Sequence, residues 1–217
     1  LVPLSVPDSV RVTILCAEAL RHAHEAELVH RDIKPDNVLV TKRGQVKVAD
    51  FGLAKAADED VSMTQSGTGM GTPLYMAPEQ ARGESTEIDP QTDIYARGAI
   101  LYNILTGFPP QTDGSTKEIL DRVRRGEFVR PSVRAPDASI PAELEAVVMK
   151  AMAKEPRDRY QSVTELQADI EAYREGRVLS VVQYSLVQRG WKWIGRHRAA
   201  SGVAGIALLV FVINSLD

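Results

Sequence analysis

The sequence predicts a mainly α-helical fold that contains one short β-hairpin and a hydrophobic helix near the C-terminus. Apolar residues recur at helical spacing over several segments. Two short strand-like strings flank a turn that contains a glycine, and residues 199–213 carry no charge. Hydrophobic residues make up 44% and charged residues 25% of the 217 residues. These values are typical of globular proteins and exclude disordered or collagen-like chains. The length suits one domain with an appendage, or two small domains.

The first predicted element is a helix over residues 10–25. Asp8 or Ser9 would cap it, because short polar side chains accept hydrogen bonds from the free N–H groups of a first turn. Cys16, the single cysteine, is interpreted as a buried apolar residue rather than a reactive thiol. The apolar face of this helix would consist of Val10, Ile14, Ala17, Leu20 and Ala23 or His24.

The second predicted element is a β-hairpin that begins after Asn37. The strings VLV, TKRGQ and VKVADF follow one another, and the glycine favours a turn near Gly44. Residues 53–76 come next and show no sustained period. A long loop in a compact domain usually carries function, so we expect one there.

Helices account for the remainder of the predicted globular part. Residues 92–105 are mostly apolar, and Gly107 followed by two prolines would end this helix. Similar patterns predict helices over 117–125, 141–153 and 163–175.

The C-terminal segment has the composition of a membrane anchor. The uncharged run of 199–213 covers 15 residues, and its extension to residue 216 approaches the length of about 20 that a spanning helix needs. The string WKWIGRHR precedes it, and tryptophans among basic residues favour a membrane interface. We therefore expect a transmembrane helix over 199–216 after a basic juxtamembrane connector over 176–198. The alternative is a buried hydrophobic C-terminal helix.

The charge pattern also bears on partners and location. The formal net charge is −3, which gives no reason to expect nucleic-acid binding, since that partner favours a basic stripe. Positive charge is retained on the cytoplasmic side of membranes. The basic connector therefore predicts a single-pass membrane protein whose globular part faces the cytoplasm.

The string HRDIKPDNVLV, residues 30–40, concentrates ionisable groups where a strand begins. Asp32 supplies a carboxylate that can accept a hydroxyl proton, and Lys34 supplies a cation for a moving phosphoryl group. The hairpin would bring Asp50 back beside Asn37. Two oxygen ligands suit magnesium, which binds few protein oxygens together with phosphates and waters. This pattern favours phosphoryl transfer.

Three further strings follow in order, ADFGLA at 49–54, GTPLYMAPE at 71–79 and TDIYARG at 92–98. Together with HRDIKPDN they resemble the C-terminal lobe of eukaryotic-type serine/threonine protein kinases, of the kind found in bacterial membrane kinases. The resemblance covers residues 8–175 and implies a protein-kinase-like lobe within residues 1–175. It also implies ATP and Mg²⁺ as cofactors, protein substrates bearing Ser or Thr, and a homodimer for phosphorylation in trans.

The resemblance implies a role for each residue of the catalytic loop. Asp32 would be the catalytic aspartate, Lys34 would contact the γ-phosphate, and Asn37 and Asp50 would hold magnesium. Thr72 would hydrogen-bond the catalytic aspartate and lysine.

Nucleotide binding and regulation follow from the same resemblance. Leu39 would lie under the adenine ring, supported by Ile100 and Ile104. Arg31 would receive a phosphate of the activation loop, because a guanidinium fork matches phosphate oxygens. The candidate acceptors are Ser62, Thr64, Ser66 and Thr68.

The structural residues that the resemblance implies lie on both sides of the long loop. Asp93 would hold the backbone of the catalytic loop, and Glu79 would pair with Arg159. The remaining structural residues are His30 and Phe51, which would stack above Asp93, and Gly52.

Two features depart from the family pattern. Arg97 occupies a helix position that is usually apolar or small, and a buried unpaired charge costs several kcal/mol, so we expect it to reach solvent or find a partner. Only 29 residues precede His30, and they contain neither a glycine-rich phosphate loop nor a strand-lysine motif. The chain is therefore expected to begin inside the kinase domain, with Leu39 and Phe51 exposed.

Two other function classes share part of this motif pattern. A membrane-anchored pseudokinase-like binding or scaffold module would have no physical need to keep Asp32, Lys34, Asn37 and Asp50 together. Small-molecule phosphotransferases resemble the catalytic loop but lack the APE string and the long activation loop.

The chain by itself is expected to show little or no kinase activity. Without a covering loop and its lysine, the nucleotide phosphates would stay open to water, which weakens every electrostatic contact. ATP turnover by the purified chain measures this, and a rate comparable to that of a whole kinase would contradict it.

Overall fold

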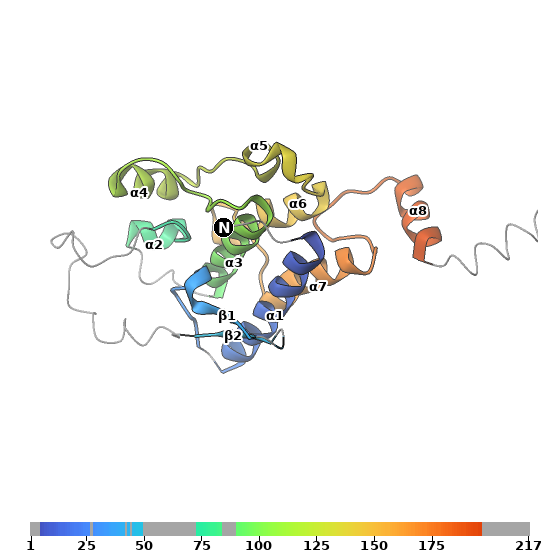
Figure 1. The fold of residues 1–217 in the computed structure, drawn as a ribbon, viewed down its shortest axis with the longest axis horizontal. Coiled ribbons are helices and arrows are strands. Elements are labelled where there is room, and N and C mark those ends of the chain that lie inside the picture. The colour runs from blue at the N-terminus through green and yellow to red at the C-terminus, as the bar shows by residue number, and fades with distance from the viewer. Residues whose placement is uncertain are drawn as a thin grey trace, which may run out of the picture.

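The computed structural model describes residues 5–26, 28–41, 43, 45–49, 73–83 and 90–196. Helices make up most of this part of the chain, and its one two-stranded sheet lies at the edge of the helices beside α1 (Figure 1). The mainly helical fold with a short hairpin is therefore confirmed for the described residues. The predicted hydrophobic helix over 199–216 lies outside it. Among the residues described, no helix combines the length and the apolar character that crossing a membrane requires.

Helix α1, Val6–Glu25, begins earlier than the sequence predicted. Ser5 caps it by accepting a hydrogen bond from the backbone N–H of Asp8, so the predicted cap at Asp8 or Ser9 was wrong. The helix extends back past Pro7 because proline is tolerated in a first turn, where its missing N–H has no helical partner. The predicted apolar face is buried. Cys16 is buried as well, and burial raises the pKa of its thiol.

The predicted hairpin is confirmed. Strands β1, Val38–Val40, and β2, Val46–Val48, pair antiparallel, with Val38 opposite Val48. The Thr41 N–H donates to the Gln45 carbonyl over 2.8 Å and continues the pairing toward the turn. The hairpin packs against α1 through β2.

Helix α3, Pro90–Thr106, forms the centre of the lobe (Figure 1). It packs against helices on several sides, which explains why almost all of its residues are buried and why most of its sequence is apolar. Gly107, with φ of 79°, follows its last residue. The helices that contact α3 are α1, α5 (Pro131–Arg134), α6 (Ala142–Ala151) and α7 (Val163–Arg174).

The predicted helices over 92–105, 117–125, 141–153 and 163–175 match α3, α4 (Thr116–Arg125), α6 and α7 to within about two residues at each end. The short helices α2, Pro78–Arg82, and α5 were not predicted, because neither is long enough to establish a period. The 3-10 helices among the described residues are η1 (Pro35–Asn37), η3 (Pro136–Ala138) and η4 (Pro156–Asp158).

Helix α8, Leu186–Arg196, lies within the segment that was expected to be a basic connector. Part of that segment is therefore helical. The tryptophans and basic residues in it indicated an interface, and the helical spacing of its apolar residues went unrecognised.

Arg97 on α3 is buried, with an exposed fraction of 1%. Its Nη2 donates to the carbonyl of Thr13 on α1 over 3.1 Å. Within the described ranges no acceptor lies within hydrogen-bond reach of Nε or Nη1. The side chain thus does not reach solvent and finds only one backbone partner, and burial lowers its pKa to about 10. This charge works against folding, because its lost hydration is replaced by a single hydrogen bond.

Replacing Arg97 with Met should stabilise the lobe. Methionine fills similar space without a charge, and such replacements of buried ionic groups raise the free energy of unfolding by about 1 to 4 kcal/mol. Urea denaturation followed by circular dichroism measures the change. The control Arg157→Met, at an exposed position, should change it by no more than about 0.5 kcal/mol. A lower urea midpoint for Arg97→Met would contradict this account of Arg97.

Candidate active site

The loop that contains the candidate catalytic residues is held by one carboxylate of α3. Asp93 Oδ2 accepts the backbone N–H of His30 over 2.8 Å, and Oδ1 accepts that of Arg31 over 2.9 Å. The exposed fraction of Asp93 is 1%. Water therefore competes little for these bonds, which are strengthened by the charge of the acceptor.

This anchoring holds Arg31 in an unfavourable backbone conformation. The φ of Arg31 is 67°, in the left-handed region that side chains with a Cβ rarely adopt, at a cost on the order of 1–3 kcal/mol. Gln80 on α2 donates from Nε2 to the Arg31 carbonyl over 2.7 Å, and its Oε1 accepts from the N–H of Ala77. The N–H and the C=O of Arg31 are thus both bound, by α3 and by α2.

The ring of His30 links this loop to the hairpin. Nε2 lies 2.9 Å from the carbonyl of Ala49, and Nδ1 lies 3.4 Å from the backbone nitrogen of Asp32. A proton on Nε2 satisfies both contacts, because the ring then donates to the carbonyl and accepts from the N–H. The buried ring thereby positions the backbone of Asp32 against the end of β2.

Three of the predicted site residues come together in this loop. Lys34 Nζ lies 2.9 Å from Asp32 Oδ2, and these side chains are 38% and 60% exposed. Asn37 is buried beneath them, and its Nδ2 donates to the Asp32 carbonyl over 2.9 Å. An accessible carboxylate and ammonium therefore stand side by side on a rigidly held backbone.

The amide of Asn37 is oriented in a way that fits a metal ligand. Since Nδ2 is used by the Asp32 carbonyl, Oδ1 is the atom of Asn37 that can coordinate a hard cation such as magnesium. The Asn37 carbonyl accepts the N–H of Ala49 over 2.8 Å, and Ala49 precedes the second predicted ligand, Asp50.

Several predicted residues lie outside the part of the chain that the structure describes. The metal ligand Asp50, the two residues Phe51 and Gly52, and Thr72 all fall there, so their predicted roles stay predictions. The same holds for the candidate phosphate acceptors Ser62, Thr64, Ser66 and Thr68.

The predicted support of Leu39 by Ile100 and Ile104 was wrong. Val38, not Leu39, packs with these isoleucines, because successive residues of a strand point to opposite faces. Leu39 is 52% exposed. Its apolar surface is therefore accessible to a ligand or to another part of a kinase, as expected.

A buried ion pair braces the lobe behind the loop. Glu79 accepts two hydrogen bonds of 2.8 Å from Arg159, one on each oxygen, and Thr92 donates a third. Burial is the largest single influence and raises the pKa of Glu79, but the hydrogen bonds and charge of Arg159, together with a backbone N–H and the Thr92 hydroxyl, hold that pKa below its usual value. The remaining N–H groups of Arg159 donate to the carbonyls of Gln91, Ala153 and Lys154. The pair thus joins α2, α3 and the chain after α6.

Three supporting residues were not found from the sequence. His24 places Nε2 2.8 Å from Asp93 Oδ2, Gln80 binds the Arg31 carbonyl, and Thr92 binds Glu79. His24 and Asp93 are 69 positions apart. Local spacing offers no signal for such a contact.

Replacing Asp93 with Asn should loosen the loop. The amide keeps the shape, but its NH₂ group would face a backbone N–H and leave that buried donor unpaired, at a cost of about 1–3 kcal/mol. Urea denaturation should show this loss, and hydrogen exchange should become faster at the amides of His30 and Arg31. The exposed Asp137→Asn serves as control, and equal behaviour of the two variants would disprove the anchoring role.

Comparison with known proteins agrees with this geometry. Residues 6–169 match the family model described as a protein kinase domain. The chain is 44% identical over 170 residues to a probable serine/threonine-protein kinase of Streptomyces coelicolor. The aligned region covers 78% of this chain and 25% of that protein. It is 40% identical over 176 residues to the serine/threonine-protein kinase PknB of Mycolicibacterium smegmatis, covering 81% and 28%.

A further relative is PknB of Mycobacterium tuberculosis, 39% identical over 175 residues, with 80% of this chain and 27% of that protein covered. The chain therefore spans about a quarter of the length of these curated relatives. The residues matched by the family model include the catalytic loop, Asp93 and Gln80, which hold its backbone, and the Glu79–Arg159 pair. On this evidence the chain belongs to the protein kinase family.

Proposed function

We propose that this chain supplies the catalytic C-terminal lobe of a serine/threonine protein kinase. The reaction is transfer of the γ-phosphate of ATP to Ser or Thr hydroxyls of protein substrates. The observation that carries the proposal is the contact of Asp32 with Lys34 on a loop whose backbone Asp93 holds. The names of the relatives, all serine/threonine-protein kinases, support the same reaction.

Asp32 orients the substrate hydroxyl and accepts its proton. Its side chain is 60% exposed, so a hydroxyl can approach within hydrogen-bond distance. Lys34, with Nζ 2.9 Å from the carboxylate, places positive charge beside the path of the phosphoryl group. The lobe thus contributes proton acceptance and charge stabilisation from two adjacent side chains.

ATP and Mg²⁺ are the proposed cofactors. The oxygens of Asn37 and Asp50 would hold the cation, and the exposed apolar surface of Leu39 would contact the adenine ring. When bound, Mg²⁺ neutralises charge on the phosphates. The side-chain amide of Asn37 is buried, and its hydrogen bond to the Asp32 carbonyl fixes its orientation.

Regulation is proposed to act on the same loop. Arg31 is exposed and sits on a backbone fixed at both its N–H and its C=O. An activation-loop phosphate on Ser62, Thr64, Ser66 or Thr68 would pair with its guanidinium. Thr72 would bond Asp32 and Lys34, and a homodimer would allow phosphorylation in trans.

Attachment to a bilayer completes the proposal. The uncharged run within residues 199–216 crosses the membrane once, and the basic residues before it keep the kinase lobe in the cytoplasm, where ATP is found. The connector over 176–198 joins the lobe to the membrane-spanning run.

A chimeric kinase tests the catalytic role of the loop. Residues 6–175 replace the matching segment of M. smegmatis PknB, so that a complete nucleotide site is present. The chimera should phosphorylate a Ser/Thr peptide, and Asp32→Asn should lower the rate by about 10²–10⁴-fold because the proton acceptor is lost. Radiolabelled phosphate transfer to the peptide measures the rate.

Asp36→Asn is the matched control, because it removes an exposed carboxylate of the same loop and should leave the rate nearly unchanged. Circular dichroism establishes that each chimera is folded. A folded chimera without phosphate transfer, or one equally sensitive to both substitutions, would rule out the proposed role of Asp32.

A further inference from the structure

Helix α8 has one apolar side and one polar side. Successive residues of an α-helix are rotated by about 100°, which puts Leu186, Val187, Trp191 and Ile194 on one half of the surface and Gln188 and Lys192 on the other. The apolar side is open to solvent, with exposed fractions of 85% for Leu186, 68% for Val187 and 70% for Trp191.

The polar side of α8 is the side that contacts the lobe. Lys192 Nζ lies 2.8 Å from Glu143 Oε1 of α6 and donates to the Arg177 carbonyl over 3.0 Å. The same ammonium lies 5.3 Å from the ring centroid of Tyr184, whose hydroxyl donates to Glu143 Oε1. A helix on a globular surface usually turns its apolar side inward. Helix α8 does the reverse, so its apolar side faces away from the protein.

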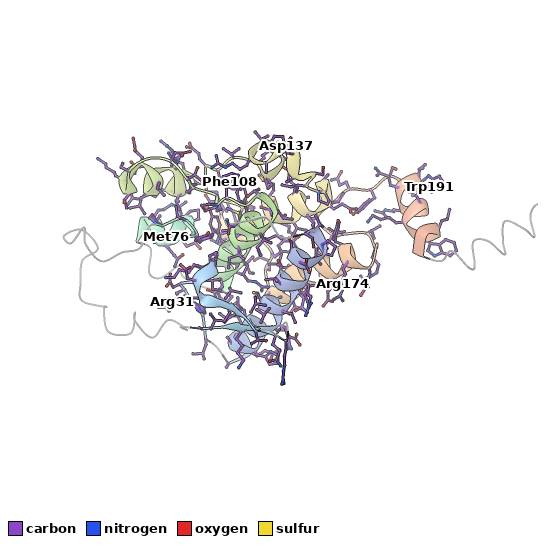
Figure 2. The ribbon with its side chains drawn as sticks, in the orientation of Figure 1. Arg31, Met76, Phe108, Asp137, Arg174 and Trp191 are labelled. Atoms are coloured by element: carbon purple, nitrogen blue, oxygen red, sulfur yellow. The ribbon has the colours of Figure 1, made fainter. Side chains whose placement is uncertain are left out.

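The position of α8 adds to this observation. It lies at one end of the long axis of the molecule, and α2 and α4 lie at the other end (Figure 1). Figure 2 shows Trp191 at the α8 end and Arg31 and Met76 toward the opposite end. A surface that contacts α8 therefore lies at the opposite end of the molecule from the catalytic loop.

We propose that α8 lies in the plane of an anionic lipid bilayer surface, with Leu186, Val187, Trp191 and Ile194 at the boundary of headgroups and acyl chains. Lys192 then couples the helix to α6, so that the lobe is held in one orientation with its catalytic loop directed away from the bilayer. This inference rests on the membrane attachment in the proposed function and defines how the lobe sits on the membrane.

A bilayer fits this side better than a protein partner for two reasons. Residues 174–198 contain one acid, Glu175, against several arginines and a lysine, which complements anionic lipids. The uncharged run 199–213 follows α8 closely, so a membrane-inserted run would bring the helix to the surface. Eleven residues bury little apolar area, and α8 therefore orients the lobe rather than anchoring it.

Intrinsic fluorescence can report on α8 alone, because both tryptophans of the chain, Trp191 and Trp193, lie in it. The complete chain is mixed with vesicles of phosphatidylcholine and phosphatidylglycerol. The emission should shift to shorter wavelength, and lipids brominated near the headgroup should quench it more strongly than lipids brominated near the acyl-chain end. Stronger quenching by the deep bromines would overturn an in-plane position.

Two variants distinguish bilayer contact by the apolar side of α8 from a general effect of added negative charge. Val187→Glu adds a negative charge on the apolar half of α8, and Gln188→Glu adds the same charge on the polar half, about 100° further round the helix. A glutamate at 188 retains an oxygen for the Ser185 N–H. Val187→Glu should lose most of the quenching by the shallow bromines, whereas Gln188→Glu should keep it. Equal loss in both variants would overturn the proposal.

Co-sedimentation with the vesicles separates this inference from the attachment on which it rests. A chain that co-sediments with its tryptophan emission unchanged would overturn the placement of α8 but retain the anchor at 199–216. A chain that does not co-sediment would overturn both. An emission shift without vesicles that grows with protein concentration would assign the apolar side to a second copy and overturn the bilayer as its occupant.

Discussion

The arrangement of this lobe depends on the carboxylate of Asp93. Its two oxygens bind consecutive backbone N–H groups of the catalytic loop, and His24 contacts the same carboxylate from α1. A carboxylate is suited to this task because it only accepts hydrogen bonds and can serve several donors at once. Arg31 keeps its left-handed backbone because its N–H is bound by Asp93 and its C=O by Gln80. The candidate chemistry therefore stands on a loop that α1, α2 and α3 hold jointly.

The effect of a buried charge on the stability of this lobe depends on its hydrogen-bond partners. Glu79 and Arg159 are fully buried and bind each other through two hydrogen bonds. Glu79 also accepts from the Thr92 hydroxyl, and Arg159 also donates to backbone carbonyls. Arg97, one turn after Asp93 on the same helix, has a single carbonyl partner among the described residues. For Glu79 and Arg159, hydrogen bonds within the protein replace the hydration that is lost on burial, whereas for Arg97 a single hydrogen bond replaces little of it. The Glu79–Arg159 pair thus specifies how helices meet, whereas Arg97 lowers the stability of the fold.

The two ends of the lobe have different tasks under the functions proposed here. At one end, Asp32 and Lys34 offer charge to a phosphoryl group from a rigid backbone, where small displacements would reduce catalysis. At the other end, α8 exposes apolar surface and is tied to the lobe through Lys192 and Glu143. Coupling the two through the packed helices α6 and α3 would keep the reactive loop turned toward cytoplasmic substrates.

The sequence by itself determined the elements whose signals are local. Apolar spacing predicted α1, α3, α4, α6 and α7, the turn glycine predicted the hairpin, and the motif strings predicted the residues of the catalytic loop. Tertiary structure decided the rest. The bond of Gln80 on the short helix α2 to the Arg31 carbonyl, and the meeting of His24 with Asp93, join groups far apart along the chain. The orientation of α8 also depends on tertiary contacts. Amphipathic spacing reveals an apolar side, but only the contact of Lys192 with Glu143 shows which side of the helix faces the lobe.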